Sequence, residues 1–146
     1  MESNQYFELV GGITRVVLRL ASTPLPELGD EDSSGVDVNL NVGDASYVER
    51  QYLDAGQYRV IHTLSFQCEH ADAPFSPEQI QRILTCGVVA DVTLATGAVI
   101  RVGWSERFGV EYPLRLQSLE FSSGGSAVDY PLQSWVWSST DRETLM

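Results

Sequence analysis

The sequence predicts a mainly β protein of the α+β class: an antiparallel β-sandwich or partly closed barrel with one short helix over residues 77–86. Residues 57–68 alternate between two sets of side chains, which is the period of a half-buried strand. Residues 76–87 carry the start and stop signals of a single helix. The other apolar segments are short and separated by turn residues, so consecutive strands are expected to pair antiparallel.

The first expected strand spans residues 13–20. Its side chains alternate, with Val16 and Leu18 on one face and Arg15 and Arg19 on the other. This pattern predicts a sheet with one apolar face and one wetter face.

A long loop and two further strands are expected before the alternating segment. Residues 21–35 contain two prolines and an acidic run, and a connection of this length is expected either to move or to contact partners. Residues 36–40 and 47–53 are predicted as strands, and the turn at residues 54–56 should join the second of them to the alternating strand in a hairpin. One face of the alternating strand should carry Tyr58, Val60, His62, Leu64, Phe66 and Cys68.

Capping residues mark both ends of the predicted helix. Ser76 and Gln79 form an S-x-x-Q capping box around Pro77, a residue that suits the first helical position. Gly87 can end the helix as a left-handed cap. Three apolar residues share one helix face at three- and four-residue spacing: Ile80, Ile83 and Leu84.

Four more strands should complete the fold, at residues 88–94, 98–104, 114–121 and 132–138. Apolar residues in the third of these change parity after Leu116, which predicts a β-bulge near Ser118. Trp135 and Trp137 share one face of the last strand, so either the helix or a neighbouring subunit should cover that face.

A chain of 146 residues is expected to form one domain, residues 1–146, with residues 141–146 as a loosely held tail. It has no apolar run long enough for a membrane span, and its first residues lack the basic region of a signal peptide. We therefore expect a protein that is made in the cytoplasm and does not insert into membranes. Cys68 and Cys86 are expected to be reduced, packed thiols.

The chain is strongly acidic, with 20 acids, nine bases and a formal net charge of −11; all the bases are arginine. Such a surface repels nucleic acid and anionic membranes, so no specific nucleic-acid binding is expected. The acids serve either solubility alone or a surface that must not adhere to DNA.

The residues form no complete catalytic or metal-binding set, so we expect no enzyme activity, no cofactor and no metal. His62 lies on the apolar face of its strand, and His70 lies near Cys68 without a second pair of zinc ligands at suitable spacing. A small enzyme that uses Cys68 or Cys86 with a histidine is one remaining alternative.

The tryptophans allow two interpretations. On an exposed sandwich face, Trp104, Trp135 and Trp137 could form a platform for a carbohydrate or peptide ligand. Between antiparallel strands they would instead be core or interface residues. A ligand-binding β-sandwich is therefore the alternative function.

Residues 105–140, SERFGVEYPLRLQSLEFSSGGSAVDYPLQSWVWSST, resemble small uncharacterised proteins in prophage-like gene clusters of gut Bacteroidales. The shared pattern is an R-F-G loop, P-L-R-L-x-S, a Ser/Gly-rich loop and a closing strand after a proline. The N-terminal run ELVGGITRVVLRL is similar to their beginnings. The resemblance implies a virion structural protein like the tail-tube and tail-terminator proteins. Those are small antiparallel barrels or sandwiches flanked by one helix that assemble in rings.

This hypothesis implies a homo-oligomer with other tail proteins as partners, made in the bacterial cytoplasm and carried in a virion or phage-like particle. Long loops such as residues 21–35 would contact neighbouring subunits, and DNA would pass along an acidic surface. The candidate interface residues are Arg107, Phe108, Tyr112, Trp135 and Trp137.

Overall fold

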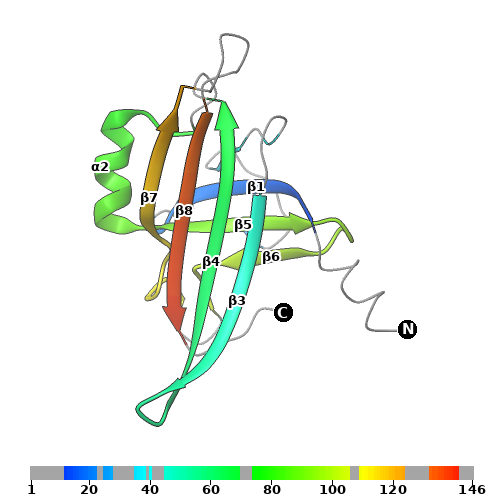
Figure 1. The fold of residues 1–146 in the computed structure, drawn as a ribbon, viewed down its shortest axis with the longest axis vertical. Coiled ribbons are helices and arrows are strands. Elements are labelled where there is room, and N and C mark those ends of the chain that lie inside the picture. Colours follow the sequence, from blue (N-terminus) through cyan, green and yellow to red (C-terminus); the bar gives the residue numbers. More distant parts are fainter. Residues whose placement is uncertain are drawn as a thin grey trace.

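In a computed structural model, the described residues form two four-stranded antiparallel sheets that pack face to face, with a helix beside them (Figure 1). The structure describes residues 12–22, 25–27, 35–38, 40, 45–69, 74–105, 109–123 and 132–141, apart from the side chain of Asp54. Sheet A has the order β2-β1-β5-β6, and sheet B has the order β3-β4-β8-β7. The strands of sheet A are β1 (Ile13–Leu20), β2 (Val36–Asp37), β5 (Val88–Leu94) and β6 (Val99–Val102). The strands of sheet B are β3 (Ala45–Asp54), β4 (Gln57–Glu69), β7 (Arg115–Ser122) and β8 (Leu132–Asp141), and the helix is α2 (Pro77–Cys86).

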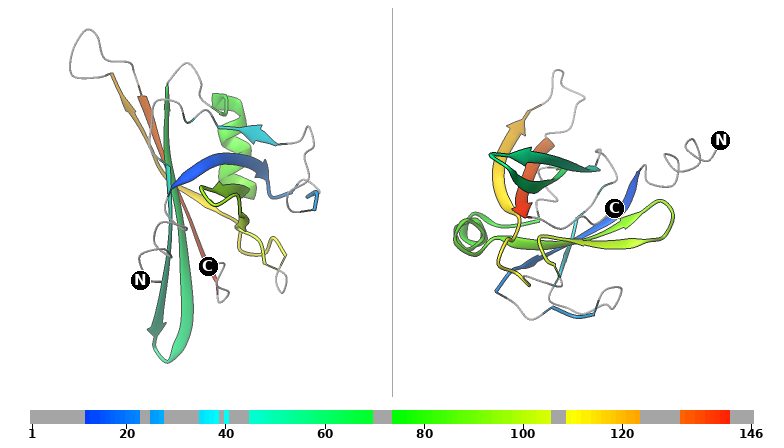
Figure 2. Two further views of the ribbon diagram at one scale, coloured as in Figure 1. Left: turned by 90° about the vertical axis from the view of Figure 1, so that its right-hand side faces the viewer. Right: turned by 90° about the horizontal axis from the view of Figure 1, so that it is seen from below.

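The fold-class prediction is confirmed in its sandwich form. The long strands of sheet B run crosswise in front of β1, β5 and β6, and the profile view separates the two layers (Figures 1 and 2). Among the described strands, the first and last of each sheet do not pair with each other, so no barrel closes.

Large aromatic side chains of sheet B fill the space between the sheets. The rings of Trp135 and Trp137 are stacked with their centroids 5.8 Å apart, and both side chains are fully buried. Phe66 stacks on Trp135, and Phe75 lies edge-on against both tryptophans. Burying one such indole removes enough surface from water to contribute about 4–6 kcal/mol before conformational entropy is counted.

The β3–β4 hairpin is the longest element and extends past the rest of the described molecule at its lower end (Figure 1). Ala55 and Gly56 connect the strands in a tight turn, with φ of 52° and 81°. The predicted face of β4 is confirmed, because the residues at alternate positions from Val60 to Cys68 are all buried. Tyr58 lies nearer the turn and is exposed.

The helix begins as predicted. The backbone N–H of Gln79 donates to Ser76 Oγ at 3.3 Å, and the backbone N–H of Ser76 donates to Gln79 Oε1 at 2.8 Å. Gly87 ends the helix with φ 75° and ψ 179°, which is an extended conformation available to glycine and not the predicted left-handed helical one. Of the predicted apolar face, Ile83 is buried but Leu84 is 55% exposed, because α2 lies at the edge of the sandwich beside β7.

The predicted bulge in β7 is confirmed and explains its apolar pattern. The register with β8 shifts between Leu116 and Ser118, so Gln117 is the extra residue. As a result, Leu116, Leu119 and Phe121 all lie on the face of sheet B that carries the tryptophans.

Several predicted strand limits need correction, because a strand ends where its hydrogen-bonding partner ends. The second predicted strand is reduced to Val36–Asp37, and the predicted strand over 98–104 is reduced to Val99–Val102. The last strand extends to Asp141, which pairs with Val60. Asp141 is therefore a buried strand residue, and the rest of the predicted tail lies outside the described residues.

Candidate functional site

The structure places the predicted interface residues in three situations. Trp135 and Trp137 are fully buried, so the chain's own second sheet covers them; this corrects their assignment to a surface contact. Tyr112 is exposed and precedes Pro113 on the way into β7. Arg107 and Phe108 lie outside the described residues.

A cluster of buried, paired charged side chains lies on the face of sheet A that points away from the core. Arg19 Nη1 donates to Asp91 Oδ2, while Arg101 Nε donates to Asp91 Oδ1 at 2.7 Å. Arg101 Nη2 also donates to the carbonyl oxygen of Pro26 at 2.8 Å, and its guanidinium lies 5.8 Å from the ring centroid of Trp104. Arg19 is only 4% exposed, so the predicted wetter face of β1 is wrong at this position. Alternation placed Arg19 opposite the core correctly but could not show that this face is also covered.

A second buried polar cluster lies on the inner face of sheet B, below the aromatic core. His62 Nε2–H donates to Asp141 at 2.8 Å, and His62 Nδ1 lies 2.6 Å from the hydroxyl oxygen of Tyr47. The Tyr47 hydroxyl donates to Glu49 Oε1 at 3.3 Å. Burial raises the pKa of Tyr47 well above its ordinary value, and the negative charges of Glu49 and Asp141 add to that effect.

Both polar clusters are closed to solvent and join strands that are distant in the sequence. Asp91 connects β1, β5 and β6, whereas His62 connects β3, β4 and β8. Within the described residues no three histidine, cysteine or acidic side chains are grouped to hold a metal ion. Neither Cys68, which is buried, nor Cys86, which is half-buried, forms a disulfide. His70, the other half of the predicted cysteine–histidine pairs, lies outside the described residues.

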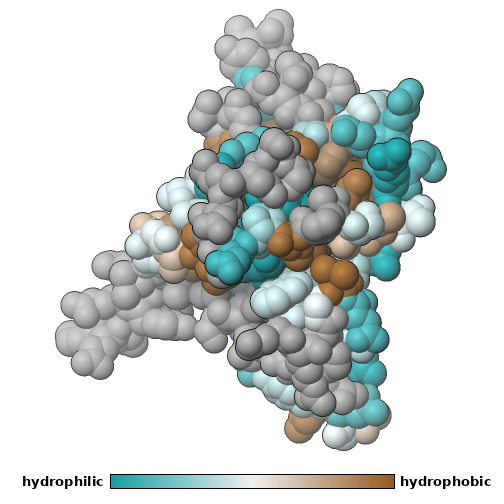
Figure 3. All heavy atoms as spheres, turned by 180° about the vertical axis from the view of Figure 1, so that it is seen from behind, coloured by the Kyte–Doolittle hydropathy of each residue, from teal (hydrophilic) through white to brown (hydrophobic). Residues whose placement is uncertain are grey.

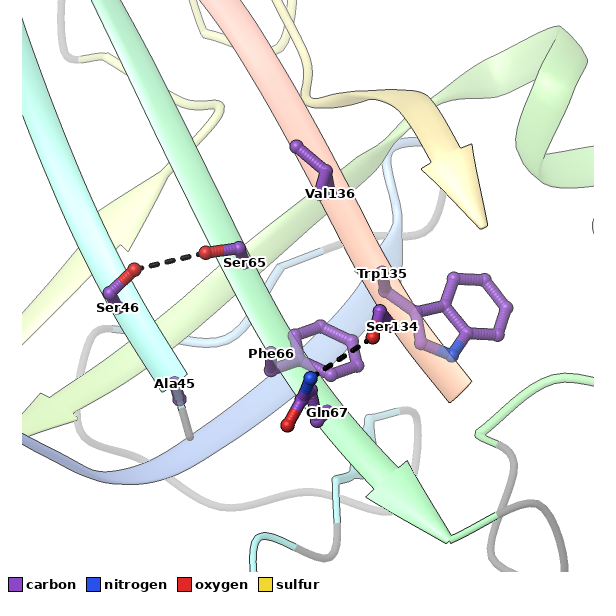
Figure 4. A pocket seen from close by; sticks show the side chains of 8 residues that line it. All are labelled: Ala45, Ser46, Ser65, Phe66, Gln67, Ser134, Trp135 and Val136. Carbon is purple, nitrogen blue, oxygen red and sulfur yellow. Dashed lines mark hydrogen bonds between the residues drawn. The ribbon is translucent and has the colours of Figure 1, made fainter. Parts of the chain in front are cut away.

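The outer face of sheet B is open and rich in hydroxyl groups. The Oγ atoms of Ser46 and Ser65 lie 2.9 Å apart, and Gln67 Nε2 donates to Ser134 Oγ at 3.2 Å across a shallow depression of about 200 Å³ (Figure 4). A wider depression of about 480 Å³ lies beside Tyr112, whose carbonyl oxygen accepts a hydrogen bond from Ser139.

This face does not provide the expected acidic surface. Its described charged side chains are three arginines and two glutamates: Arg50, Arg59, Arg115, Glu69 and Glu120. Glu49, Asp91 and Asp141 instead make buried contacts inside the fold. The two glutamates on the described part of this face are outnumbered by its arginines, so these side chains do not form an acidic surface.

Exposed apolar side chains mark the two edges of sheet B. We define the hairpin patch as Leu53 and Tyr58, which face each other on β3 and β4 near the turn and include the most exposed apolar side chain of this set, Leu53, at 73%. Val48 is also exposed but lies on the opposite face of β3. We define the helix patch as Leu84, Leu119 and Phe121, which lie on α2 and β7. Seen from the side of sheet A, the projecting end of the molecule is mostly hydrophilic, with a hydrophobic spot near its tip (Figure 3).

No direct signal for these two patches is present in the sequence. Leu53 and Tyr58 have the parity of core residues, as do Leu119 and Phe121 after the bulge. These residues are exposed because the ends of β3, β4 and β7 that carry them extend beyond the second sheet. The sequence feature that could have indicated an exposed patch is an edge strand followed by a tight turn.

Searches of protein-family models, curated proteins and solved structures find no match to this chain. No helix among the described residues is long and apolar enough to cross a membrane.

Proposed function

We propose that this protein is a non-enzymatic structural component of a phage or phage-like tail, as a tail-tube, terminator or neck protein, that acts by ring-like self-assembly. In this proposal it is made in the bacterial cytoplasm and incorporated into the particle with other tail proteins. The observation that carries the proposal is the projecting β3–β4 hairpin with its exposed apolar residues.

A projecting hairpin of this kind is suited to contact another protein. Two strands alone are marginally stable in water, so an arm gains from a partner that covers it. Leu53 and Tyr58 face each other across the strands near the turn, and Tyr58 is 41% exposed. The Tyr58 hydroxyl donates to Gln51 at 2.8 Å, which orders the arm before any contact is made. Exposed apolar side chains on an ordered arm are typical of a protein–protein contact.

The architecture and the charge agree with this proposal. The sequence resemblance implies a small antiparallel sandwich flanked by one helix, and the chain has that arrangement. A net charge of −11 would keep free subunits soluble and away from DNA before assembly.

The ligand-binding alternative loses the feature that motivated it. Trp135 and Trp137 are buried, and Trp104 lies half-buried under Arg101, so the three indoles do not form an open stacking platform. The two depressions on sheet B are shallow and mostly lined by small or polar residues.

The mass of the purified protein in solution tests this proposal. Size exclusion with light scattering over a wide concentration range should show discrete oligomers, and negative stain of the same samples should show rings or tubes. A protein that stays monomeric at high concentration, and forms no ring with tail partners, would contradict the self-assembly. The tail role has its own test, because mass spectrometry of purified phage-like particles should find this chain among the virion proteins.

A further inference from the structure

We propose that four inward-facing side chains form a proton-operated latch at the base of the β3–β4 arm, and we define this latch as Tyr47, Glu49, His62 and Asp141. With one added proton, each of its three contacts is a hydrogen bond; when that proton leaves, one of the bonds is lost. The latch lies inside a single chain, so this inference does not depend on the proposed self-assembly.

The latch is a chain of three contacts that crosses three strands of sheet B. Asp141 Oδ1 on β8 lies 2.8 Å from His62 Nε2 on β4, and His62 Nδ1 lies 2.6 Å from Tyr47 Oη on β3. Tyr47 Oη lies 3.3 Å from Glu49 Oε1 on the same strand. The first two contacts are short and the third is long, so the bond to Glu49 is the weakest of the three.

The latch has two states that differ by one hydrogen. Ionised carboxylates only accept hydrogen bonds, whereas a phenol and a neutral imidazole each supply one hydrogen. Burial and the negative charges of Glu49 and Asp141 raise the pKa of Tyr47, so its hydroxyl keeps its hydrogen. The neutral latch therefore has two hydrogens for its three contacts, and an imidazolium, which has two N–H groups, supplies the third.

The added proton binds at His62 Nδ1, because an imidazole is ordinarily a stronger base than a carboxylate. In that state His62 donates to Asp141 and to Tyr47 Oη, and the Tyr47 hydroxyl donates to Glu49. When the proton passes to solvent, the Tyr47 hydroxyl turns to His62 Nδ1 and its bond to Glu49 is lost. His62 Nε2 keeps its hydrogen in both states, since the carboxylate of Asp141 can only accept it.

The surroundings of the latch favour an added positive charge. The side chain of His62 is 2% exposed, and those of Glu49 and Asp141 are each 6% exposed. An imidazolium between two buried carboxylates offsets one of their charges. The inward-facing side chains of β1, β5 and β6 are uncharged, and Tyr58, the next titratable side chain toward the turn on this face of β4, is bonded to Gln51. Both acids also have other interactions in the chain, so proton release removes the bond from the tyrosine without leaving either acid unpartnered.

The latch is the last covered contact of β3 on this face before the arm projects. Nearer the turn on the same face, Gln51, Leu53 and Tyr58 are exposed. In the described part of the chain β3 pairs with β4 alone, so the side-chain contacts of the latch add to what holds this edge strand. Proton release should therefore loosen β3, whereas β8 keeps its contact with His62 in both states.

NMR of the ring nitrogens in the 15N-labelled full chain observes the two states directly. His70 is the other histidine, so His70→Gln assigns the signals of His62. Between about pH 5 and about pH 9, with circular dichroism showing a folded chain, Nδ1 should change from N–H to unprotonated nitrogen while Nε2 stays N–H. The latch is disproved if Nδ1 stays in one state throughout, or if Nε2 loses its hydrogen first.

Glu49→Gln should hold the latch closed at every pH. The glutamine amide can donate to Tyr47 Oη and the Tyr47 hydroxyl to His62 Nδ1, so all three contacts are hydrogen bonds without an added proton. In the unchanged protein, amide hydrogen exchange of β3, corrected for the intrinsic effect of pH, should become about fivefold faster on proton release, while that of β8 stays the same. In Glu49→Gln, exchange of β3 should not change over the same range.

Glu120→Gln is the matched control, because it makes the same chemical change at an exposed position on the open face of β7. Its pH dependence should equal that of the unchanged protein. If Glu49→Gln keeps that dependence, or if Glu120→Gln abolishes it, the latch is wrong. If Glu49→Gln does not fold, the NMR titration of the unchanged protein still decides. Light scattering tests self-assembly separately, since a monomer would contain the same latch.

Discussion

The two sheets differ in what lies against the face that each turns away from the common core. On sheet A that face is buried over Arg19, Asp91 and Arg101, whose charges are paired beneath residues that include Pro26. On sheet B the corresponding face is open and carries mainly small hydroxyl and amide groups. Sheet A is therefore covered on both faces, whereas sheet B leaves one face open.

Because of this difference, substitutions in the two sheets should affect different properties: folding in sheet A, and association in sheet B. Residues of sheet A are held on both faces, so changes there should lower the free energy of unfolding. Residues on the open face and outer ends of sheet B have little to lose within one chain, so changes there should leave folding nearly unchanged.

Substitution of Asp91 should lower the stability most. Replacing it in Asp91→Ala leaves two buried guanidinium groups without the carboxylate that they share, which should lower the free energy of unfolding by about 3–5 kcal/mol. Thr63→Ala is the matched change on the other sheet, since it also lies on a central strand and points away from the core. It should cost less than about 0.5 kcal/mol. Urea unfolding measures both, and equal losses would show that the two outer faces do not differ.

The next effect concerns the point where the sheets are joined. A Cβ at Gly87 would lie 2.8 Å from Pro113 Cγ and 2.9 Å from the carbonyl oxygen of Leu114. Its backbone conformation also favours glycine alone, so Gly87→Ala should cost about 1–3 kcal/mol or more. Gly97→Ala separates these causes, because Gly97 has a φ of 91° but no atom within 4 Å of the added Cβ. If Gly97→Ala cost as much in thermal unfolding as Gly87→Ala, crowding at the junction would not be the cause.

A smaller effect should come from the polar cluster inside sheet B. Because the pKa of Tyr47 is raised in the folded chain, the unfolded chain releases this proton first as pH rises. The stability linked to this proton is complete below the ordinary pKa of 10.0 and is lost as pH rises above it.

Tyr47→Phe removes both the hydroxyl and this linkage. The variant should lose about 1 kcal/mol at neutral pH, with a shallower loss of stability above pH 10 than the unchanged protein. Denaturant unfolding at a series of alkaline pH values measures the difference. If the free energy of unfolding fell with the same slope above pH 10 in both proteins, Tyr47 would not be the cause of the alkaline loss of stability.

The smallest effect is a gain at the tip of the hairpin. Ala55 has a φ of 52°, which alanine adopts at some cost and asparagine tolerates better. Ala55→Asn should raise the free energy of unfolding by about 0.5–1 kcal/mol. The oligomer mass should stay the same, since the change strengthens the arm without altering the hairpin patch. A loss of stability would indicate a different turn from the one described.

Features that depend on neighbouring residues were predicted well from the sequence. The helix over residues 77–86 and the strand over residues 88–94 have the limits expected from the capping box, the glycine and the apolar run. The alternation in β4 identified its buried face, and the parity change after Leu116 located the bulge. Each of these signals acts over a few residues, so it is present in the sequence itself.

Features that depend on distant segments were missed or misplaced. Arg19 was expected on a wetter face, yet its partner Asp91 lies 72 residues away. His62 had no visible partner in its own segment, because Asp141 is 79 residues away and Tyr47 lies on the other strand of the hairpin. Trp135 and Trp137 could equally have faced a ligand, a neighbouring subunit or a second sheet. The apolar patches at the two edges of sheet B were not expected at all.

Periodicity, capping and turn chemistry are local properties, so they already specify which segments become strands or helix and which side chains share a face. Local patterns do not specify which of those faces is covered, because that depends on segments far apart in the chain. Burial depends on what packs against a face, and in this chain the second sheet covers Trp135 and Trp137 but stops short of Leu53 and Phe121. That uneven cover gives sheet B its exposed edges.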